Sequence, residues 1–487
     1  MKRTEWKRAC RQTSLGLLLL ASGAGCLTVG PDYRPPETTT PAAWQTPAGA
    51  SSETLVQWWQ VFDDPALETL VVDVQTQNRD LTAATARMEA YAASYGMARA
   101  DWFPGVAAQA TAAQDRQSER VHTPVGYSAT DNPGWLYQAG FSASWELDLW
   151  GRVRRSVESA KGQLDASLED VRNLQVMLQA QVAAEYIGLR MNQQRLAYAK
   201  RNIVLQRKTL KVVRGRYDAG LTGELDVRQA EMNLAATSAQ VPALKSAIDE
   251  ALNALCFLTG RLPGELDALR KARPVPVATE LPGLLPAELL RQRPDIRSAE
   301  RSLAAQTAKI GVAKADFFPA LALNGTFAFA ATDAGEFGKK ASQDFTVGPS
   351  LTWAIFNAGK VRNHVRAEEA ATRAALANYE KTVLAAYQEC ENALAAYVNE
   401  GQRLAALRDT VKGAEQSVEL VSELYRSGLA NFQNVLDMQR QLSSYQDLLA
   451  QSTGAAAADL VAVFKAFGGG WTPGPVVPVA PAKTTGS

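Results

Sequence analysis

An apolar side chain recurs every seven residues in two long stretches of this chain, and no other feature constrains the fold more. The first series comprises Leu168, Val182, Leu189, Leu196, Ile203, Leu210 and Tyr217, with only Gln175 breaking it, and the second comprises Leu376, Val383, Cys390, Tyr397, Leu404, Val411, Val418 and Tyr425. Adding 208 to a position in the first series gives a position in the second. A seven-residue spacing keeps one helix face apolar along its whole length. The sequence therefore predicts two long helices related by an internal duplication.

Each series ends at a turn that contains glycine, and a second apolar stripe follows each turn. The turns read YDAGL at 217–221 and YRSGL at 425–429. The stripes after them are Val227, Leu234, Val241, Ile248 and Leu255, then Val435, Leu442, Leu449, Ala456 and Val463. This pattern predicts two antiparallel helix pairs. The first helix, from about Val157 to Tyr217, would be on the order of 90 Å long at ~1.5 Å per residue, which is too long for a globular core.

The first long helix carries a further apolar stripe on nearly its opposite side. Its members are Met191, Tyr198, Leu205 and Val212, and the second copy has a weaker version in Ala406, Gly413 and Leu420. Two apolar flanks separated by polar faces indicate a helix in a wall, with a neighbour on each side and water on both surfaces. The alternative from the helices alone is a solvated two-helix coiled coil.

The period changes from helical to two in four segments, which predicts two β-hairpins placed between helices. Apolar and small or polar residues alternate over 135–149, 320–330 and 345–355, and more weakly over 105–113. Segments of this length with an aromatic face fit membrane-spanning strands of ~9–11 residues. Four strands cannot close a barrel, and an open edge cannot face lipid. Several copies must therefore share one barrel, with eight strands from two copies or twelve from three. The alternative is an amphipathic sheet on a soluble core.

The N-terminus has the features of a secretory signal that ends at a cysteine. Residues 1–25 hold five basic side chains and a short apolar run, and small residues precede Cys26. The run is too short to span a bilayer as a helix. The segment resembles the lipobox of bacterial lipoproteins, which implies cleavage before Cys26 and acylation of it, including a palmitate chain. Residues 26–64, rich in Pro and Thr at first, are expected to form the lipidated tether.

Composition argues against several classes of function. Lys and Arg number 51 and Asp and Glu 50, with no basic cluster, so nothing points to nucleic acid. The two histidines, His122 and His364, are far apart, which disfavours a zinc site or a histidine-based triad. No phosphate-binding loop, HExxH or GxSxG motif occurs, so we expect no enzyme and no cofactor. Cys256 and Cys390 are expected to be buried thiols, although a disulfide is chemically allowed.

Several longer motifs resemble the TolC-like outer-membrane efflux channels, closest to the lipoproteins of OprM and NodT type. They are GPDYRPP at 30–36, WWQVFDDP at 58–65, LTGRLPG at 258–264, LLRQRPDIRSAERSL at 289–303 and GPSLTWAIFNAGK at 348–360. The resemblance implies a homotrimer with a twelve-strand β-barrel in the outer membrane, four strands per chain. A long antiparallel α-helical barrel would extend into the periplasm. It also implies an inner-membrane RND pump and a periplasmic adaptor as partners, with drugs or other small toxic molecules as substrates.

The resemblance also assigns roles to residues near the two glycine turns. Tyr425 with Asp437 and Arg440, and Tyr217 with Asp226 and Arg228, match the positions that form the family's periplasmic gate. Gly220, Leu221, Gly428 and Leu429 match the tips that meet the adaptor. The alternative for Asp226 and Asp437 is purely local, since a carboxylate early in a helix favours the helix dipole.

These expectations define a domain order and two rival functions. We expect a first repeat at 65–282, a second at 283–467 and a flexible tail at 468–487. One rival is a type I exit duct for polypeptides, and the other is a lipid-tethered periplasmic coiled-coil scaffold without a pore. The aromatic alternating strands argue against the scaffold, which has no use for them.

Overall fold

The computed structural model describes residues 28–36, 56–115, 134–277 and 292–471. The helices are α2 (Pro65–Gln77), α3 (Arg79–Ala100), α4 (Arg152–Asp218), α5 (Glu224–Leu258), α6 (Pro294–Ala315), α7 (Lys360–Arg426) and α8 (Phe432–Ala466). The strands are β1 (Gly105–Asp115), β2 (Gly134–Leu147), β3 (Ala320–Ala331) and β4 (Gln343–Thr352). Short 3₁₀ helices η2, η3 and η5 cover Trp58–Phe62, Asp267–Arg270 and Lys340–Ser342.

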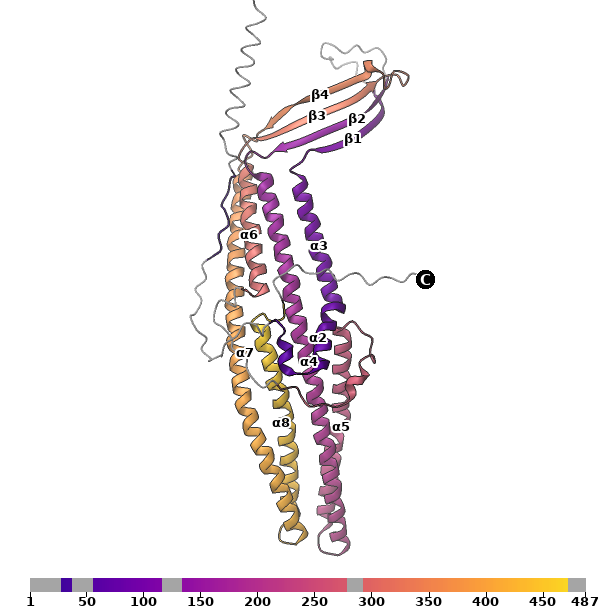
Figure 1. The fold of residues 1–487 in the computed structure, drawn as a ribbon, viewed down its shortest axis with the longest axis vertical. Coiled ribbons are helices and arrows are strands. Elements are labelled where there is room, and N and C mark those ends of the chain that lie inside the picture. Colours follow the sequence, from indigo (N-terminus) through magenta and orange to yellow (C-terminus); the bar gives the residue numbers. More distant parts are fainter. Residues whose placement is uncertain (1–27, 37–55, 116–133, 278–291, 472–487) are drawn as a thin grey trace, which may run out of the picture. The chain divides into compact units, whose positions relative to one another are not determined.

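The predicted duplication of long helix pairs is confirmed. Helices α4 and α7 each have 67 residues, and α5 and α8 each have 35. Their bounds differ by 208 at both ends, as the sequence repeat predicts. The α4/α5 and α7/α8 pairs are antiparallel, and their turns lie at the same end (Figure 1).

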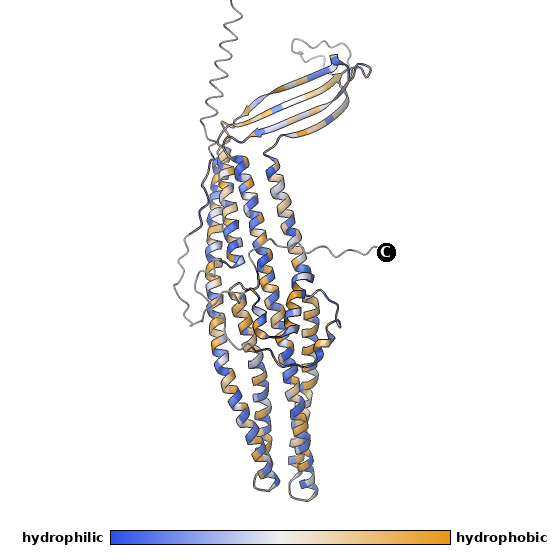
Figure 2. Ribbon diagram, in the orientation of Figure 1, coloured by the Kyte–Doolittle hydropathy of each residue, from blue (hydrophilic) through white to orange (hydrophobic). Residues whose placement is uncertain are grey.

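The heptad series forms the contact face of each long helix. Val182, Leu189, Ile203 and Leu210 are buried on α4. Three of their four counterparts on α7, Cys390, Val411 and Val418, are buried as well, and the fourth, Tyr397, is half-buried. Polar residues are interspersed along both helices (Figure 2). No helix in the described part of the chain combines the length and the apolarity that crossing a bilayer requires.

The four strands form one antiparallel sheet in the order β1-β2-β3-β4. Phe141 pairs with Phe327, and Phe327 pairs with Phe345, so the aromatic positions share one face. The other face carries a polar ladder in which Ser144 Oγ lies 2.9 Å from Asn324 Oδ1 and Asn324 Nδ2 lies 2.6 Å from Ser350 Oγ. Strand β4 ends at Thr352, three residues before the end of the predicted alternation.

The helical segment between Pro65 and Ala100 is divided into α2 and α3, because the chain breaks at Asn78. Asn78 has an extended backbone with ψ 132° between α2 and α3. Its Oδ1 accepts hydrogen bonds from the backbone N–H groups of Asp80 and Leu81 at 2.8 and 3.0 Å, which caps α3. Its Nδ2 donates to the carbonyl of Leu258 at 2.8 Å, which ties this break to the end of α5.

Two compact units each draw on both halves of the sequence. One contains the sheet, with residues 89–166 and 299–378. In it, the N-terminal strand is fixed: Val29 N donates to Trp150 O at 3.0 Å, and Arg155 pairs with Asp32 at 2.6 Å. Gly30 lies against Gly311, where an added Cβ would come within 2.5 Å of the Gly311 Cα.

The other unit contains both glycine turns, with residues 167–277, 292–298 and 379–471 among its described parts. The buried Trp58 of η2 stacks on Phe464 at 5.4 Å between ring centroids. Cys256 and Cys390 are both free and buried, and burial raises the pKa of the Cys390 thiol to about 12. Cys26 and His122 lie outside the described residues.

Replacing Asn78 tests the capped break between α2 and α3. Asn78→Ala removes the α3 cap and leaves the buried Leu258 carbonyl without its donor, so we expect a loss of about 2 kcal/mol in unfolding free energy. Asn78→Ser keeps a capping oxygen and should lose about half as much. Urea unfolding of the detergent-solubilised protein, followed by circular dichroism, measures both. Equal losses would mean that the cap contributes nothing.

Candidate gate at the helix-pair turns

The two turns close their helices with the same backbone geometry. Gly220 has φ 69° and Gly428 has φ 79°, in the left-handed region that favours glycine. Leu221 N donates to Arg216 O at 2.8 Å, and Leu429 N donates to Leu424 O at 2.8 Å. These bonds satisfy carbonyls that the helix end would otherwise leave free. The tight turns that the glycines predict are therefore present in both halves.

The helices that follow the turns begin differently. Asn431 caps α8, with its side chain accepting from the backbone N–H of Asn434 at 3.0 Å. Gly223 precedes α5 and offers no side chain. There the Thr222 hydroxyl hydrogen-bonds the Asp226 carboxylate in the first turn. The local role expected for Asp226, a carboxylate near a helix N-terminus, is thus compatible with its position.

The ends of all four helices share one apolar core. It contains Leu210 and Val213 of α4, Val227 and Ala230 of α5, Tyr425 of α7, and Phe432, Val435 and Leu436 of α8. The rings of Tyr425 and Phe432 lie 5.7 Å apart. Tyr425 is 4 % exposed, and burial raises the pKa of its phenol. The two helix pairs are therefore packed together at their turns.

Arg216 joins the two turns, and the sequence interpretation did not include it. Its guanidinium carbon lies 4.8 Å from the ring centroid of Tyr425. Its Nη1 donates to the Tyr425 carbonyl at 2.9 Å, at the C-terminal end of α7. A cation over an aromatic face and at a helix C-terminus is doubly favoured. The sequence signal that could have identified Arg216 is its place as a basic residue in the last turn of a predicted helix.

The remaining predicted gate residues lie near the turns, and their contacts within one chain are local. In the described residues no hydrogen bond or ion pair joins Tyr425 to Asp437 or Arg440. The Asp437 Oδ1 accepts from Gln433 Nε2 at 2.8 Å, and Arg440 is exposed. Tyr217 is 44 % exposed. The gating role of these residues therefore stays a prediction.

Arg228, the other predicted gate cation, belongs to a surface cluster of charges. Its guanidinium lies 2.9 Å from Glu224 and 3.0 Å from Glu231, and Arg214 of α4 lies 2.7 Å from Glu231. Hydrogen bonds from Arg214, and then from Arg228, lower the pKa of the Glu231 carboxyl. These pairs are exposed, so each contributes little to stability. They link α4 to α5 rather than one helix pair to the other.

The two leucines expected to meet an adaptor are highly exposed. Leu221 is 66 % exposed and Leu429 is 77 % exposed. Both follow their glycine directly, at the tip of a turn. Adding a Cβ at Gly220 or Gly428 would meet no heavy atom within 4 Å, so these turns have open space around them.

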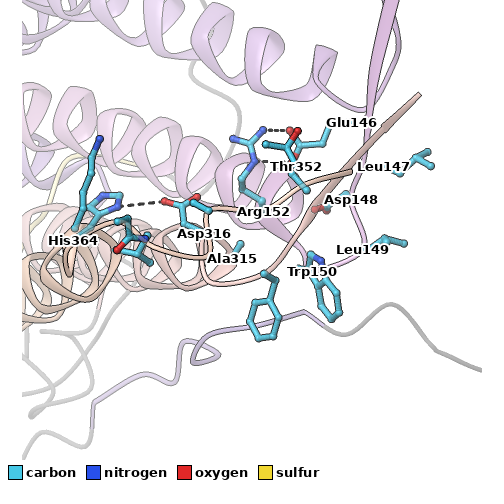
Figure 3. A pocket seen from close by; sticks show the side chains of 16 residues that line it. Glu146, Leu147, Asp148, Leu149, Trp150, Arg152, Ala315, Asp316, Thr352 and His364 are labelled. Carbon is cyan, nitrogen blue, oxygen red and sulfur yellow. Dashed lines mark hydrogen bonds and ion pairs between the residues drawn. The ribbon is translucent and has the colours of Figure 1, made fainter. Parts of the chain in front are cut away.

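A cavity of about 570 Å³ lies where the sheet joins its helices (Figure 3). Arg152 bonds Glu146 through Nε at 2.7 Å, and His364 Nδ1 lies 3.5 Å from Asp316 Oδ2. Figure 3 shows both pairs pointing toward one another. In the described residues no group of three or more His, Cys, Asp or Glu side chains could hold a metal ion. The first pair links β2 to α4, and the second links the end of α6 to α7.

The sequence profile described as "Outer membrane efflux protein" matches residues 70–261 and 285–469. The solvent efflux pump outer membrane protein SrpC of Pseudomonas putida is 32% identical over 470 residues, which is 94% of this chain and 98% of SrpC. Nodulation protein T of Rhizobium leguminosarum bv. trifolii is 30% identical over 473 residues, covering 96% of this chain and 98% of that protein.

A solved structure agrees with these sequence relatives. The outer-membrane channel OprN superposes with a TM-score of 0.84 at 37% identity, covering 92% of this chain and 100% of that chain. Both the profile and the relatives span both halves of the sequence, including the two glycine turns.

Substituting the turn glycine at 428 tests the backbone geometry of the tip. Gly428→Ala forces a side chain into the left-handed region and should cost about 1–2 kcal/mol of unfolding free energy. Gly215→Ala, on an exposed position within α4 that has no neighbouring atom to clash with, should instead gain about 0.5–1 kcal/mol. Denaturant unfolding should therefore show shifts of opposite sign. A gain at both positions would contradict the strained turn.

Proposed function

This chain belongs to the outer membrane efflux protein family, and we propose that three copies of it form one conduit whose periplasmic end is closed by the residues at the helix-pair turns. The chain is an outer-membrane exit channel of an efflux system and extends into the periplasm. It is not an enzyme. Transport through it is passive, and an inner-membrane pump supplies the energy.

The two outer strands of the sheet are the observation that carries assembly with other copies, and the family sets the proposed number at three. Strands β1 and β4 lie at the edges and each pairs on one side only in the described residues. The aromatic face exposes Phe141, Phe327 and Phe345, as a lipid-facing surface would. Lipid cannot satisfy the free backbone groups of an edge strand. Edges from neighbouring copies must therefore pair, and three copies give twelve strands.

The partners follow from the exposed tips and from the family. Leu221 and Leu429 present apolar side chains at the turns, where a periplasmic adaptor would bind. The adaptor would in turn connect the channel to an RND pump of the inner membrane. Since a relative is named as part of a solvent efflux pump, small apolar or toxic compounds are the proposed substrates.

The proposed gate forms between copies, not within one. Asp226 and Asp437 are half-buried near the turns, while Tyr217, Arg228 and Arg440 are exposed in the single chain. Exposed residues at a shared axis would be brought together by three-fold assembly. Asp226 and Asp437 would then face the bore. Their carboxylates would repel the same carboxylates of the other copies unless cations on neighbouring helices offset the charge.

The lipid anchor would be attached close to the C-terminal end of β2. Cys26 precedes Thr28 by two residues, and Val29 is bonded to Trp150 between β2 and α4. Acylation of Cys26 would therefore hold the outer-membrane lipid close to the sheet. The polar bonds of Arg155 to Val29 and Asp32 keep that segment in place.

Conductance tests both the channel and its gate. The purified protein in planar bilayers should conduct ions weakly, and Asp226→Ala with Asp437→Ala should raise the conductance because the closed state loses its inter-copy contacts. Asp249→Ala with Asp409→Ala removes the same charge far along α5 and α7 and should change little. No current from any variant would refute the channel. A current that the turn variant leaves unchanged would refute only the gating role.

Labelling with a radioactive or alkyne fatty acid tests the anchor. Cys26→Ser should abolish incorporation, because the thiol is the proposed attachment point. The control is Cys256→Ser, whose thiol is buried in α5 and should not affect labelling. Labelling that persists in Cys26→Ser would place the lipid on another residue.

A further inference from the structure

The strand-to-helix junction of the sheet unit occurs twice, once in each repeat. The first reads WELDLWGR at 145–152, where the chain passes from β2 to α4, and the second reads WAIFNAGK at 353–360, where it passes from β4 to α7. In each, a tryptophan indole donates to a backbone carbonyl of the preceding link between helix and strand. Trp145 Nε1 lies 3.0 Å from Trp102 O, and Trp353 Nε1 lies 3.1 Å from Phe317 O. The two junctions are therefore anchored alike, and both belong to one compact unit.

The first junction neutralises its cations within the chain. Arg152 Nε donates to Glu146 at 2.7 Å (Figure 3). Arg154 Nε donates to Asp148 at 3.1 Å. The Asp148 carboxylate also accepts from the backbone N–H groups of Val153 and Arg154, each at 3.0 Å. Two arginines at the start of α4 are thus paired with two carboxylates at the end of β2.

The second junction keeps the two cations and lacks both carboxylates. At an offset of 208, the matching basic residues are Lys360 and Arg362, and the positions of the two acids hold Ala354 and Phe356. Lys360 and Arg362 are both exposed. Neither side chain takes part in an ion pair or a hydrogen bond in the part of the chain that the structure describes. Two positive charges at the start of α7 therefore lack the partners that the first repeat supplies.

Acidic side chains lie near Lys360, but each already has a partner. The cavity that Lys360 lines is also lined by Glu146, Asp148 and Asp316. Their ion pairs are with Arg152, Arg154 and His364, in that order. An anion that binds Lys360 and Arg362 together would therefore come from another molecule.

Large apolar side chains precede these cations and are uncovered. Ile355 is 83 % exposed and Phe356 is 88 % exposed. They come directly after the exposed apolar positions of β4, which are Phe345, Val347 and Leu351. Since that row belongs to the proposed lipid-facing surface, Ile355 and Phe356 extend the surface to the start of α7.

This combination of side chains fits one class of ligand. At a membrane interface, apolar side chains lie among the acyl chains while lysine and arginine meet the phosphates of the lipid headgroups. Free phosphate or an acidic protein surface would use the cations but would leave Ile355 and Phe356 without an apolar neighbour. The end of a membrane-spanning strand is also the level at which a headgroup lies.

We propose that an anionic phospholipid binds at the second junction, with its phosphate at Lys360 and Arg362 and its acyl chains against Ile355 and Phe356. The phosphate supplies the negative charge that two carboxylates supply at the first junction. This rests on the proposed function, which puts the sheet in lipid.

The first junction would hold a lipid of its own, but a covalent one. The proposed acyl anchor is on Cys26, and Val29 shortly after it donates to the carbonyl of Trp150 at 3.0 Å. Each repeat would therefore fix the depth of the sheet with one lipid, the first through a covalent bond and the second through charge.

Photocrosslinking from position 355 tests the site. The full-length protein, with the photoreactive residue p-benzoylphenylalanine in place of Ile355, is reconstituted in vesicles of phosphatidylethanolamine with a minority of phosphatidylglycerol. Mass spectrometry of the crosslinked lipid should show phosphatidylglycerol enriched about fivefold over its share of the bilayer, the factor that one cation near an anionic surface provides. Lys360→Gln with Arg362→Gln should abolish the enrichment while crosslinking continues. Arg366→Gln with Arg373→Gln removes the same charge from exposed positions further along α7 and should leave the enrichment unchanged.

Transferring the carboxylates of the first repeat tests the same site without removing a cation. Ala354→Glu with Phe356→Asp should abolish the enrichment, because the chain then neutralises Lys360 and Arg362 itself. Ala354→Gln with Phe356→Asn adds side chains of the same size without the charge and should keep the enrichment. Both variants should fold, since the first repeat carries acids at these positions. Enrichment that persists in the acidic variant would contradict the proposed site.

The outcomes separate the lipid site from the position of the sheet in the membrane. The same photoreactive residue in place of Val347, inside β4, should crosslink both lipids in proportion to the bilayer. No lipid crosslink from either position would refute the sheet's place in lipid, and with it the proposed function. Crosslinks from position 347 without enrichment at position 355 would overturn the lipid site alone. Enrichment that inorganic phosphate abolishes, but sodium chloride of equal ionic strength does not, would assign the cations to free phosphate instead.

Discussion

Backbone hydrogen bonding at the edges of the four-stranded sheet is the constraint on which the architecture depends. Among the strands that the structure describes, β2 and β3 are paired on both sides, whereas β1 and β4 are each paired on one side. In water such edges are tolerated, while in lipid each free group costs several kcal/mol. A strand count that cannot close on itself therefore makes assembly with other copies a condition of membrane insertion.

The helices face a similar requirement, but for apolar side chains, which must be covered by a neighbouring helix. A long helix in a wall needs an apolar flank on each side, and α4 has both flanks covered within one chain. Helix α7 has one flank covered and keeps Leu384 and Leu420 exposed on others. The contact between the two halves adds polar bonds to this packing, such as Gln439 Nε2 to Thr209 Oγ1 at 2.7 Å. Polar bonds fix the register of surfaces that apolar packing alone would let slide.

Departures from the repeat show where the halves have taken different roles. Asn78 and Arg293 occupy matching positions before α3 and α6. The Asn78 side chain donates to the carbonyl of Leu258 at the end of α5, and the Arg293 side chain donates to the carbonyl of Ala466 at the end of α8. Arg293 also pairs with Glu389 at 2.8 Å, a contact that the first half lacks because Gln181 stands at the matching position. The second half therefore holds its junction with charges, and the first half holds it with a neutral amide.

The sequence by itself determined the duplication, the long helix pairs, the strand positions and the glycine turns. These features are periodic or local, so each is encoded in the spacing of a few residues, as Leu210 and Val418 or Gly220 and Gly428 illustrate. Tertiary structure decided the break at Asn78, because its side-chain amide donates to the carbonyl of Leu258, 180 residues further along the chain. It also decided that Arg216 reaches Tyr425 and that Tyr217 is left uncovered. Spacing within a helix fixes which face a side chain occupies, but the neighbour on that face depends on how distant segments pack.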